Sequence, residues 1–234
     1  MAIYLHETVE ATYGKVDEYC AGMGDIGLPA MNDWKLNIVG FYQNVFSSGI
    51  WPEVVAIWSI DDWETYIWMM KHAKDVEGMV RWMKAAHGWR QRGFDRMMIP
   101  VSWSPTPPRQ PNFKASGGLV IQQMYTVIPG RSQEFLAIME KEICPKAKAA
   151  GLTLEFMWRN NYNQFEFFGG WSVPNWEAYA EYQNKRDADN GNQLPGFDKV
   201  FPMLQKMDER VLKPTSYSPL GGGAGTVDGL MPNQ

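Results

Sequence analysis

The sequence predicts an α+β protein built from two copies of one small β-α-β-β-α-β domain, whose sheets pack into a pseudo-symmetric barrel. Three observations lead to this fold class. The chain repeats itself internally, both halves show the same succession of strand and helix patterns, and a stretch rich in proline and glycine separates the halves. A chain of 234 residues with 45% hydrophobic residues can bury a core in each of two such domains.

The internal repeat consists of three separated blocks in the same order. The matching blocks are 13–19 with 129–135, 57–66 with 170–179, and 100–105 with 214–219. Their offsets of 116, 113 and 114 residues require only small changes in loop length. Chance resemblance between aromatic-rich segments is the alternative, and the shared order argues against it. The expected units are a first copy at 1–105, a linker at 106–118, a second copy at 119–219 and a flexible Gly-rich tail at 220–234.

In the first copy, alternating apolar and polar residues predict strands, and apolar residues at helical spacing predict helices. The expected elements are a strand at 3–9, a helix at 15–32, strands at 36–45 and 53–59, a helix from Asp61 and a last strand before Pro100. The buried stripe of the second helix is expected to comprise Trp63, Tyr66, Ile67 and Met70. An extra helix is expected between residues 71 and 93, carrying Met79, Trp82, Met83 and Ala86 at helical spacing.

The second copy repeats this order without the extra helix. Its expected elements are a strand at 119–128, a helix that carries Phe135, Leu136, Met139 and Ile143, strands at 152–160 and 164–171, a helix from Pro174 and a last strand before Pro214. Asparagines at the turn between the two middle strands suit a hairpin. The polar segment 187–193 stands in place of the extra helix, so we expect a loop there.

Each copy is thus a ferredoxin-like unit, and packing the two uncovered sheet faces together gives the barrel. With this arrangement, residues 3–218 resemble the dimeric α+β barrel superfamily as a tandem fusion. The strand 54–59 followed by Asp61-Asp62-Trp63 resembles the NIPSNAP-type branch. The resemblance implies relatives that are cofactor-free monooxygenases, polyketide cyclases, isomerases, haem enzymes or proteins of unknown role. It also implies a site in the cavity between the sheet and the helices or loops.

Composition and missing motifs exclude several function classes. A net charge of −4 without a basic block argues against nucleic acid as a partner. No apolar run approaches the roughly 18 residues of a membrane span, and the first residues do not form a signal peptide, so we expect a cytoplasmic protein. The two cysteines, Cys20 and Cys144, form no paired motif. Phosphate-binding loops, dinucleotide fingerprints and nucleophile elbows are absent, and the three histidines are scattered, so we expect no cofactor and no metal.

Strand alternation nominates the residues that could meet a ligand. On the first strand, Tyr4, His6 and Thr8 should face the barrel interior, away from the helices. On residues 152–159, the even-numbered side chains are expected to face the helices and the odd-numbered ones the interior. By the offset of 116, His6 corresponds to Gln122, so only the first copy has an imidazole there.

His6 has the pKa range for proton transfer near neutral pH, which makes it the leading catalytic candidate. The expected catalytic residues are His6, Glu155 and Tyr4. The expected substrate-binding residues are Arg159, Gln122, Thr8, Phe41 and Met157. Two structural alternatives remain open: His6 as a hydrogen-bonded structural residue, and an ion pair between Glu155 and Arg159.

The aromatic content of 11 Trp, 10 Tyr and 11 Phe suits a pocket for a small hydrophobic molecule. We expect a cofactor-independent isomerase or lyase that acts by acid–base chemistry on an aromatic, polyketide-like or terpenoid substrate. The alternatives are a cofactor-free monooxygenase, a NIPSNAP-like binder of a ligand or partner without turnover, and a haem protein with His72 or His87 as axial ligand. A second copy of the chain is the candidate protein partner.

Overall fold

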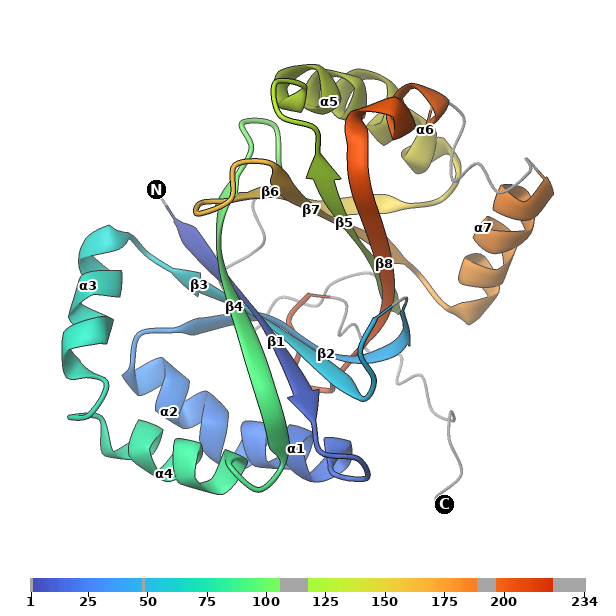
Figure 1. Ribbon diagram of the computed structural model, residues 1–234. Helices are drawn as coiled ribbons and strands as arrows, with labels where there is room; N and C mark the ends of the chain where they lie inside the picture. Colours follow the sequence, from blue (N-terminus) through green and yellow to red (C-terminus); the bar gives the residue numbers. More distant parts are fainter. Residues whose placement is uncertain (1, 48, 106–117, 189–196, 221–234) are drawn as a thin grey trace.

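Eight antiparallel strands close into one barrel in the computed structural model, which describes residues 2–47, 49–105, 118–188 and 197–220 (Figure 1). The order around the barrel is β1-β3-β2-β8-β5-β7-β6-β4. The strands are β1 (Ile3–Ala11), β2 (Asn37–Ser47), β3 (Glu53–Ile60), β4 (Arg90–Pro100), β5 (Leu119–Val127), β6 (Thr153–Asn160), β7 (Glu166–Val173) and β8 (Leu204–Pro214).

Helices lie on the outside of this barrel. They are α1 (Val16–Gly22), α2 (Leu28–Asp33), α3 (Trp63–His72), α4 (Glu77–Ala86), α5 (Ser132–Ile138), α6 (Cys144–Ala149) and α7 (Trp176–Ala188). A π-helical turn joins α1 to α2 (Met23–Gly27) and another joins α5 to α6 (Met139–Ile143), so the long first helix predicted in each half is present. Two 3₁₀ turns (Phe197–Lys199 and Phe201–Met203) precede β8. The predicted loop at 187–193 lies partly outside the described residues.

Each half contributes four neighbouring strands, β4-β1-β3-β2 from the first and β8-β5-β7-β6 from the second. The two sets join edge to edge through β2–β8 and β4–β6, all antiparallel. The inner faces of the two sets pack against each other in the interior, and the pairing of their edges, which was not predicted, closes the barrel. Closure supplies partners for the backbone groups of the edge strands, which a face-to-face sandwich would leave open.

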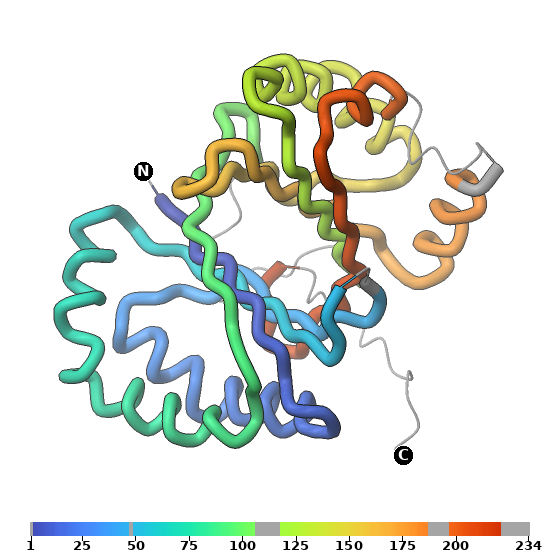
Figure 2. The backbone as a smooth tube through the Cα atoms, in the orientation of Figure 1, coloured from blue at the N-terminus to red at the C-terminus, as the bar shows by residue number. Residues whose placement is uncertain are grey.

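The core has three parts. Two lie outside the barrel, between its wall and the helices of either half, and the third fills the interior. Figure 2 shows the helices of the first half on one side of the barrel and those of the second half on the opposite side. Inside the first-half layer, a side chain on Gly22 would overlap the ring of Trp89, which explains a glycine within a helical segment.

The extra helix of the first half is observed as α4, and Met79, Trp82 and Ala86 are buried as its spacing predicts. The stripe predicted for α3 is wrong. Only Met69 is buried on this helix, whereas Ile67 and Met70 are about half exposed, at 51% and 49%. The physical reason is that α3 covers a cavity instead of packing directly on the sheet.

Candidate functional site

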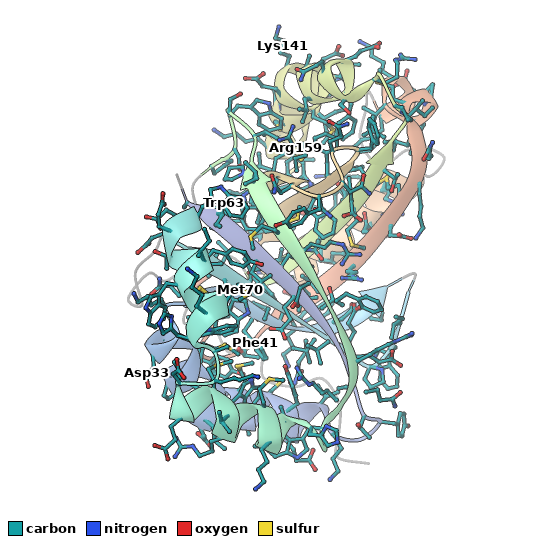
Figure 3. The ribbon with its side chains drawn as sticks, turned by 60° about the vertical axis from the view of Figure 1, so that its left-hand side comes forward. Asp33, Phe41, Trp63, Met70, Lys141 and Arg159 are labelled. Atoms are coloured by element: carbon teal, nitrogen blue, oxygen red, sulfur yellow. The ribbon has the colours of Figure 1, made fainter. Side chains whose placement is uncertain are left out.

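A cavity of about 700 Å³ lies between the outer face of the first-half strands and helices α2, α3 and α4. Figure 3 shows α3, with Trp63 and Met70 labelled, on the outer side of this layer. More than half of the lining residues have aromatic or thioether side chains, among them Trp34, Trp58, Tyr66, Met69, Met79 and Trp82. A cavity of this size and composition suits a small, largely apolar molecule.

Glu7 places a carboxyl group on the sheet side of the cavity. It lies on β1, on the same face as Leu5, and Trp58 donates a hydrogen bond from Nε1 to its Oε2 at 3.2 Å. Burial, reinforced by the nearby charge of Asp95, raises the pKa of Glu7 to about 7. A carboxyl with this pKa can give or take a proton at neutral pH.

Asp95 and Arg90 add further charged groups to the cavity from β4. Asp95 lies directly opposite Glu7 in the β1–β4 ladder. The Asp95 side chain is exposed to solvent; partial desolvation beside the cavity raises its pKa, and the positive charge of Arg90 acts in the opposite direction. The cavity therefore combines an aromatic lining with two carboxyl groups, the guanidinium of Arg90 and the ammonium of Lys74.

The second half holds an amide where the first half has Glu7. Gln123 lies 116 residues further on, and Trp171 donates from Nε1 to its Oε1 at 3.0 Å, as Trp58 does to Glu7. The hydroxyl of Tyr125 also donates to Gln123 Oε1, and Tyr125 stands where the first half has the smaller Val9. The two halves thus share this tryptophan hydrogen bond, and its acceptor is a titratable carboxyl in the first half and an amide in the second.

His6 points into the barrel, as predicted, and lies at its centre. The amide nitrogen of Gln122 lies within hydrogen-bond distance of Nε2 of His6, at 2.7 Å. The ring of Phe168 meets the imidazole edge to face, with centroids 4.8 Å apart. Burial lowers the pKa of His6 well below its usual value, and the charges of Arg210 and Arg96 lower it further. His6 is therefore neutral, and it does not line the first-half cavity.

One ion pair lies next to each residue of the His6–Gln122 contact, and the more buried of the two joins Arg210 to Glu53. Arg210 Nε is 3.0 Å from Glu53 Oε2, and Asn44 donates to the same carboxylate at 2.8 Å. Arg210 also approaches the hydroxyl of Thr8 at 3.4 Å. Because β8 belongs to the second half and Glu53 to the first, this pair links the two halves.

The second ion pair has the equivalent residues with the halves exchanged. Arg96 Nε lies 3.3 Å from Glu166 Oε2, and Asn160 donates to that carboxylate at 2.6 Å. The guanidinium of Arg96 also lies over the Phe168 ring, 5.3 Å from its centroid. The offsets of 114 between the arginines, 113 between the glutamates and 116 between the asparagines match the offsets of the repeat.

Tyr4 also faces the interior, where its ring stacks on Trp158 with centroids 4.3 Å apart. Glu155 lies at a bulge of β6 between Leu154 and Phe156 and accepts a hydrogen bond from Ser172. Burial raises the pKa of Glu155.

The predicted alternation of β6 is wrong beyond Glu155. The bulge shifts the register by one residue, so Phe156 and Trp158 face the interior, and Met157 packs in the helix layer of the second half. Arg159 is exposed and lines a second cavity of about 350 Å³ beside α5, so it cannot pair with Glu155.

The predicted binding residues do not form one site. Gln122 and Thr8 join His6 in the interior, whereas Phe41 is buried in the helix layer of the first half. Figure 3 shows Phe41 and Arg159 in opposite halves of the molecule.

Glu7, Asp95 and Arg90 were not predicted from the sequence. The available signal was Glu7 itself, a charged residue in line with Ile3, Leu5 and Val9 on the apolar face of a strand. A charge in such a position requires a partner or an opening. For Asp95 and Arg90 no comparable signal exists, because the register of β4 against β1 comes only from the fold.

Among the described residues, no group of three or more His, Cys, Asp or Glu side chains could hold a metal ion. His72 Nδ1 lies 2.8 Å from the backbone oxygen of Trp68, and its ring stacks on the Trp68 ring. His87 follows the last turn of α4.

Cys20 and Cys144 are free thiols whose pKa values burial raises to about 12. None of the helices in the described part of the chain is long and apolar enough to cross a lipid bilayer.

The chain is similar over its whole length to several solved structures. A candidate monooxygenase from Fusobacterium nucleatum subsp. nucleatum has a TM-score of 0.62 and 10% identity, covering 91% of this chain and 92% of that one. A candidate monooxygenase from Lactobacillus acidophilus has a TM-score of 0.60 and 13% identity, covering 97% and 99%. An anthrone oxidase-like protein has a TM-score of 0.60 and 9% identity, covering 92% and 91%. At these identities the likeness establishes the α+β barrel fold.

No curated protein matches the chain in sequence. The family model that matches is NIPSNAP, and the match covers residues 122–219, which run from Gln122 in β5 to the segment after β8. The second half of the chain is therefore similar to the NIPSNAP family.

Proposed function

We propose that the protein is a cofactor-independent enzyme that moves a proton on a small apolar substrate held in the first-half cavity. Glu7 is the proton carrier. The observation that carries this proposal is a carboxyl group on the wall of a cavity lined by Trp34, Trp58 and Tyr66, where burial raises its pKa to about 7. Proton transfer by such a group contributes roughly 10²- to 10⁴-fold in rate.

The proton transfer is assigned to Glu7 rather than to the neighbouring His6. Consecutive residues of a strand point to opposite faces, so only one of the two can serve the cavity. The pKa of His6 is lowered, and its Nε2 is occupied by Gln122. Glu7 retains one hydrogen bond, from Trp58, and lines the open space.

Anthrone is a suitable probe substrate. It is an apolar, three-ring ketone whose methylene protons exchange with solvent through its enol. Under anaerobic conditions in D₂O, proton NMR follows loss of the methylene signal. We expect catalysed exchange by the unmodified protein and at least about 100-fold less by Glu7→Gln. Quenching of tryptophan fluorescence by anthrone, measured on the same samples, should be retained. Binding without exchange by the unmodified protein would instead identify a ligand binder.

A cofactor-free monooxygenase is the second candidate, favoured by the whole-length likeness to the candidate monooxygenases. Such an oxygenation starts with the same deprotonation, after which the substrate anion reacts with O₂. An oxygen electrode separates the two functions: anthrone-dependent O₂ consumption that Glu7→Gln lacks supports the oxygenase, and anaerobic exchange alone supports the isomerase-type reaction.

The two halves are also proposed to be ferredoxin-like copies of one ancestral domain, at 1–105 and 119–219. The matched ion pairs and the matched Trp58–Glu7 and Trp171–Gln123 contacts support this. On this proposal the cavity arose after duplication, in the copy that gained α4.

A further inference from the structure

We propose that Asp95 is a second proton carrier and that Glu7 and Asp95 act as a pair on an enolisable ketone with an apolar, aromatic skeleton. The inference rests on the proposed function, since it accepts Glu7 as the group that exchanges a proton in the cavity. It adds a second catalytic residue and a substrate class.

The geometry of the β1–β4 ladder brings the two carboxyl groups together. Glu7 and Asp95 are directly opposite each other in the register, and both side chains line the same cavity. Side chains opposite each other on one face of an antiparallel pair have Cβ atoms roughly 4.5–5.5 Å apart. A substrate in the cavity can therefore meet both carboxyl groups at once.

The second half contains an equivalent pair, whose two side chains are hydrogen-bonded to each other. Gln123 and Glu209 occupy the equivalent positions, 116 and 114 residues further on, and the Gln123 amide donates to Glu209 Oε2 at 2.9 Å. A protonated carboxyl matches a primary amide in shape, and its O–H can donate a hydrogen bond as the amide N–H does. A protonated Glu7 can therefore donate a hydrogen bond to an ionised Asp95, as the Gln123 amide donates one to Glu209.

The surroundings of the two pairs differ. In the second half, Arg186 lies 2.8 Å from Glu209 and fixes its negative charge. In the first half, burial raises the pKa of Glu7 to about 7 and the charge of Asp95 raises it further, whereas the exposed Asp95 is only partly desolvated, so the pair retains one proton up to about neutral pH. The other ionisable groups near the pair are Tyr19 from α1, Tyr66 from α3, Lys74 after α3, Arg90 from β4 and Tyr162 after β6.

The pair supplies both proton transfers that enolisation needs. The carboxylate of Asp95 takes a proton from the carbon next to the substrate carbonyl, and the C–H electron pair becomes the C=C bond of the enol. At the same time the carbonyl π electrons take the proton of the Glu7 carboxylic acid. The products are the enol, an ionised Glu7 and a protonated Asp95, and the reverse step regenerates the ketone. No oxidant or reductant is consumed.

The test uses anthrone exchange in anaerobic D₂O with four variants: Glu7→Gln, Asp95→Asn, the double variant, and Glu10→Gln as control. Glu10 lies on the same strand and pairs with Arg92 away from the cavity. We expect each cavity substitution to reduce exchange at least about 100-fold and the double variant to be no slower than the singles, because the two groups act as a unit. The control should keep the rate of the unmodified protein.

The outcomes separate this inference from the proposed function. Full exchange by Asp95→Asn with loss in Glu7→Gln would overturn the pair and leave Glu7 as a lone carrier. Full exchange by both variants would overturn both proposals. If Asp95→Asn does not fold, the pH profile of the unmodified protein decides. A bell-shaped profile supports the pair, because one carboxyl must be ionised and the other protonated, and a profile with a single limb contradicts it.

Discussion

His6 and Gln122 meet at the centre of the barrel, with their Nε2 atoms 2.7 Å apart, and they occupy equivalent positions in the two halves. The contact joins β1 to β5, the first strand of each half. Each residue is buried, and an ion pair lies next to each, that of Arg96 beside His6 and that of Arg210 beside Gln122. This arrangement links the two halves and leads to a direct prediction about His6.

His6→Gln should fold and keep its thermal stability. A second glutamine would face Gln122, and two amides can donate and accept between them. Since the His6 pKa is already lowered, the neutral amide replaces a neutral ring. We expect the melting temperature to change by less than about 4 °C, the shift that 1 kcal/mol produces in a chain of this size. Loss of the cooperative transition would show that the imidazole ring itself is required for packing.

Arg210→Met should destabilise the protein by about 3–5 kcal/mol, because it leaves the buried Glu53 carboxylate without its cation. Arg96→Met is the matched control, since it removes the equivalent cation beside the more exposed Glu166. The exposed fraction is 0% for the Glu53 side chain and 19% for that of Glu166. Urea unfolding should therefore give the larger loss for Arg210→Met, and equal losses would contradict the assignment.

Glu7 should make stability depend on pH in a defined direction. Its pKa in the folded state, about 7, lies above the ordinary 4.5, so the folded protein binds the proton more tightly than the unfolded chain. The stabilising contribution is complete below about pH 4.5 and is lost as the pH rises to about 7. Relative to Glu7→Gln, the unmodified protein should lose up to about 3 kcal/mol across this window. A constant difference between the two unfolding curves would contradict the raised pKa.

Trp58→Phe should raise the pKa of Glu7 further, because the indole N–H stabilises the ionised carboxylate. The limb of the exchange profile that reports Glu7 should move to higher pH. Trp171→Phe is the matched control, since it removes the equivalent bond to the neutral Gln123. A shift in both variants, or in neither, would contradict the role of Trp58.

Much of the fold could be predicted from the sequence, because the repeat, the alternation of β1 and the helical spacing of α4 are local patterns. The mode of barrel closure could not, because the pairing of β2 with β8 and of β4 with β6 depends on contacts between distant segments. The bulge at Glu155 could not be predicted from the sequence either. One additional residue reversed the faces of Met157 and Arg159, and nothing in the local sequence announces it.

The candidate site was harder to predict for a related reason. His6 carries the side chain usually associated with proton transfer, and Glu7 carries one that is common on protein surfaces. Burial reverses their suitability near neutral pH: it lowers the pKa of the imidazole and raises that of the carboxyl. This difference depends on which face of β1 opens on a cavity, and hence on where α3 and α4 lie.

The most direct test compares the two neighbours on β1 in one experiment. Anthrone exchange in anaerobic D₂O is measured for His6→Gln and Glu7→Gln at the pH optimum of the unmodified protein. With Glu7 as the proton carrier, Glu7→Gln should lose at least about 100-fold in exchange rate, whereas His6→Gln should stay within about twofold. The opposite result, a folded His6→Gln that has lost exchange beside an active Glu7→Gln, would contradict the role of Glu7 and return the proton transfer to the barrel interior.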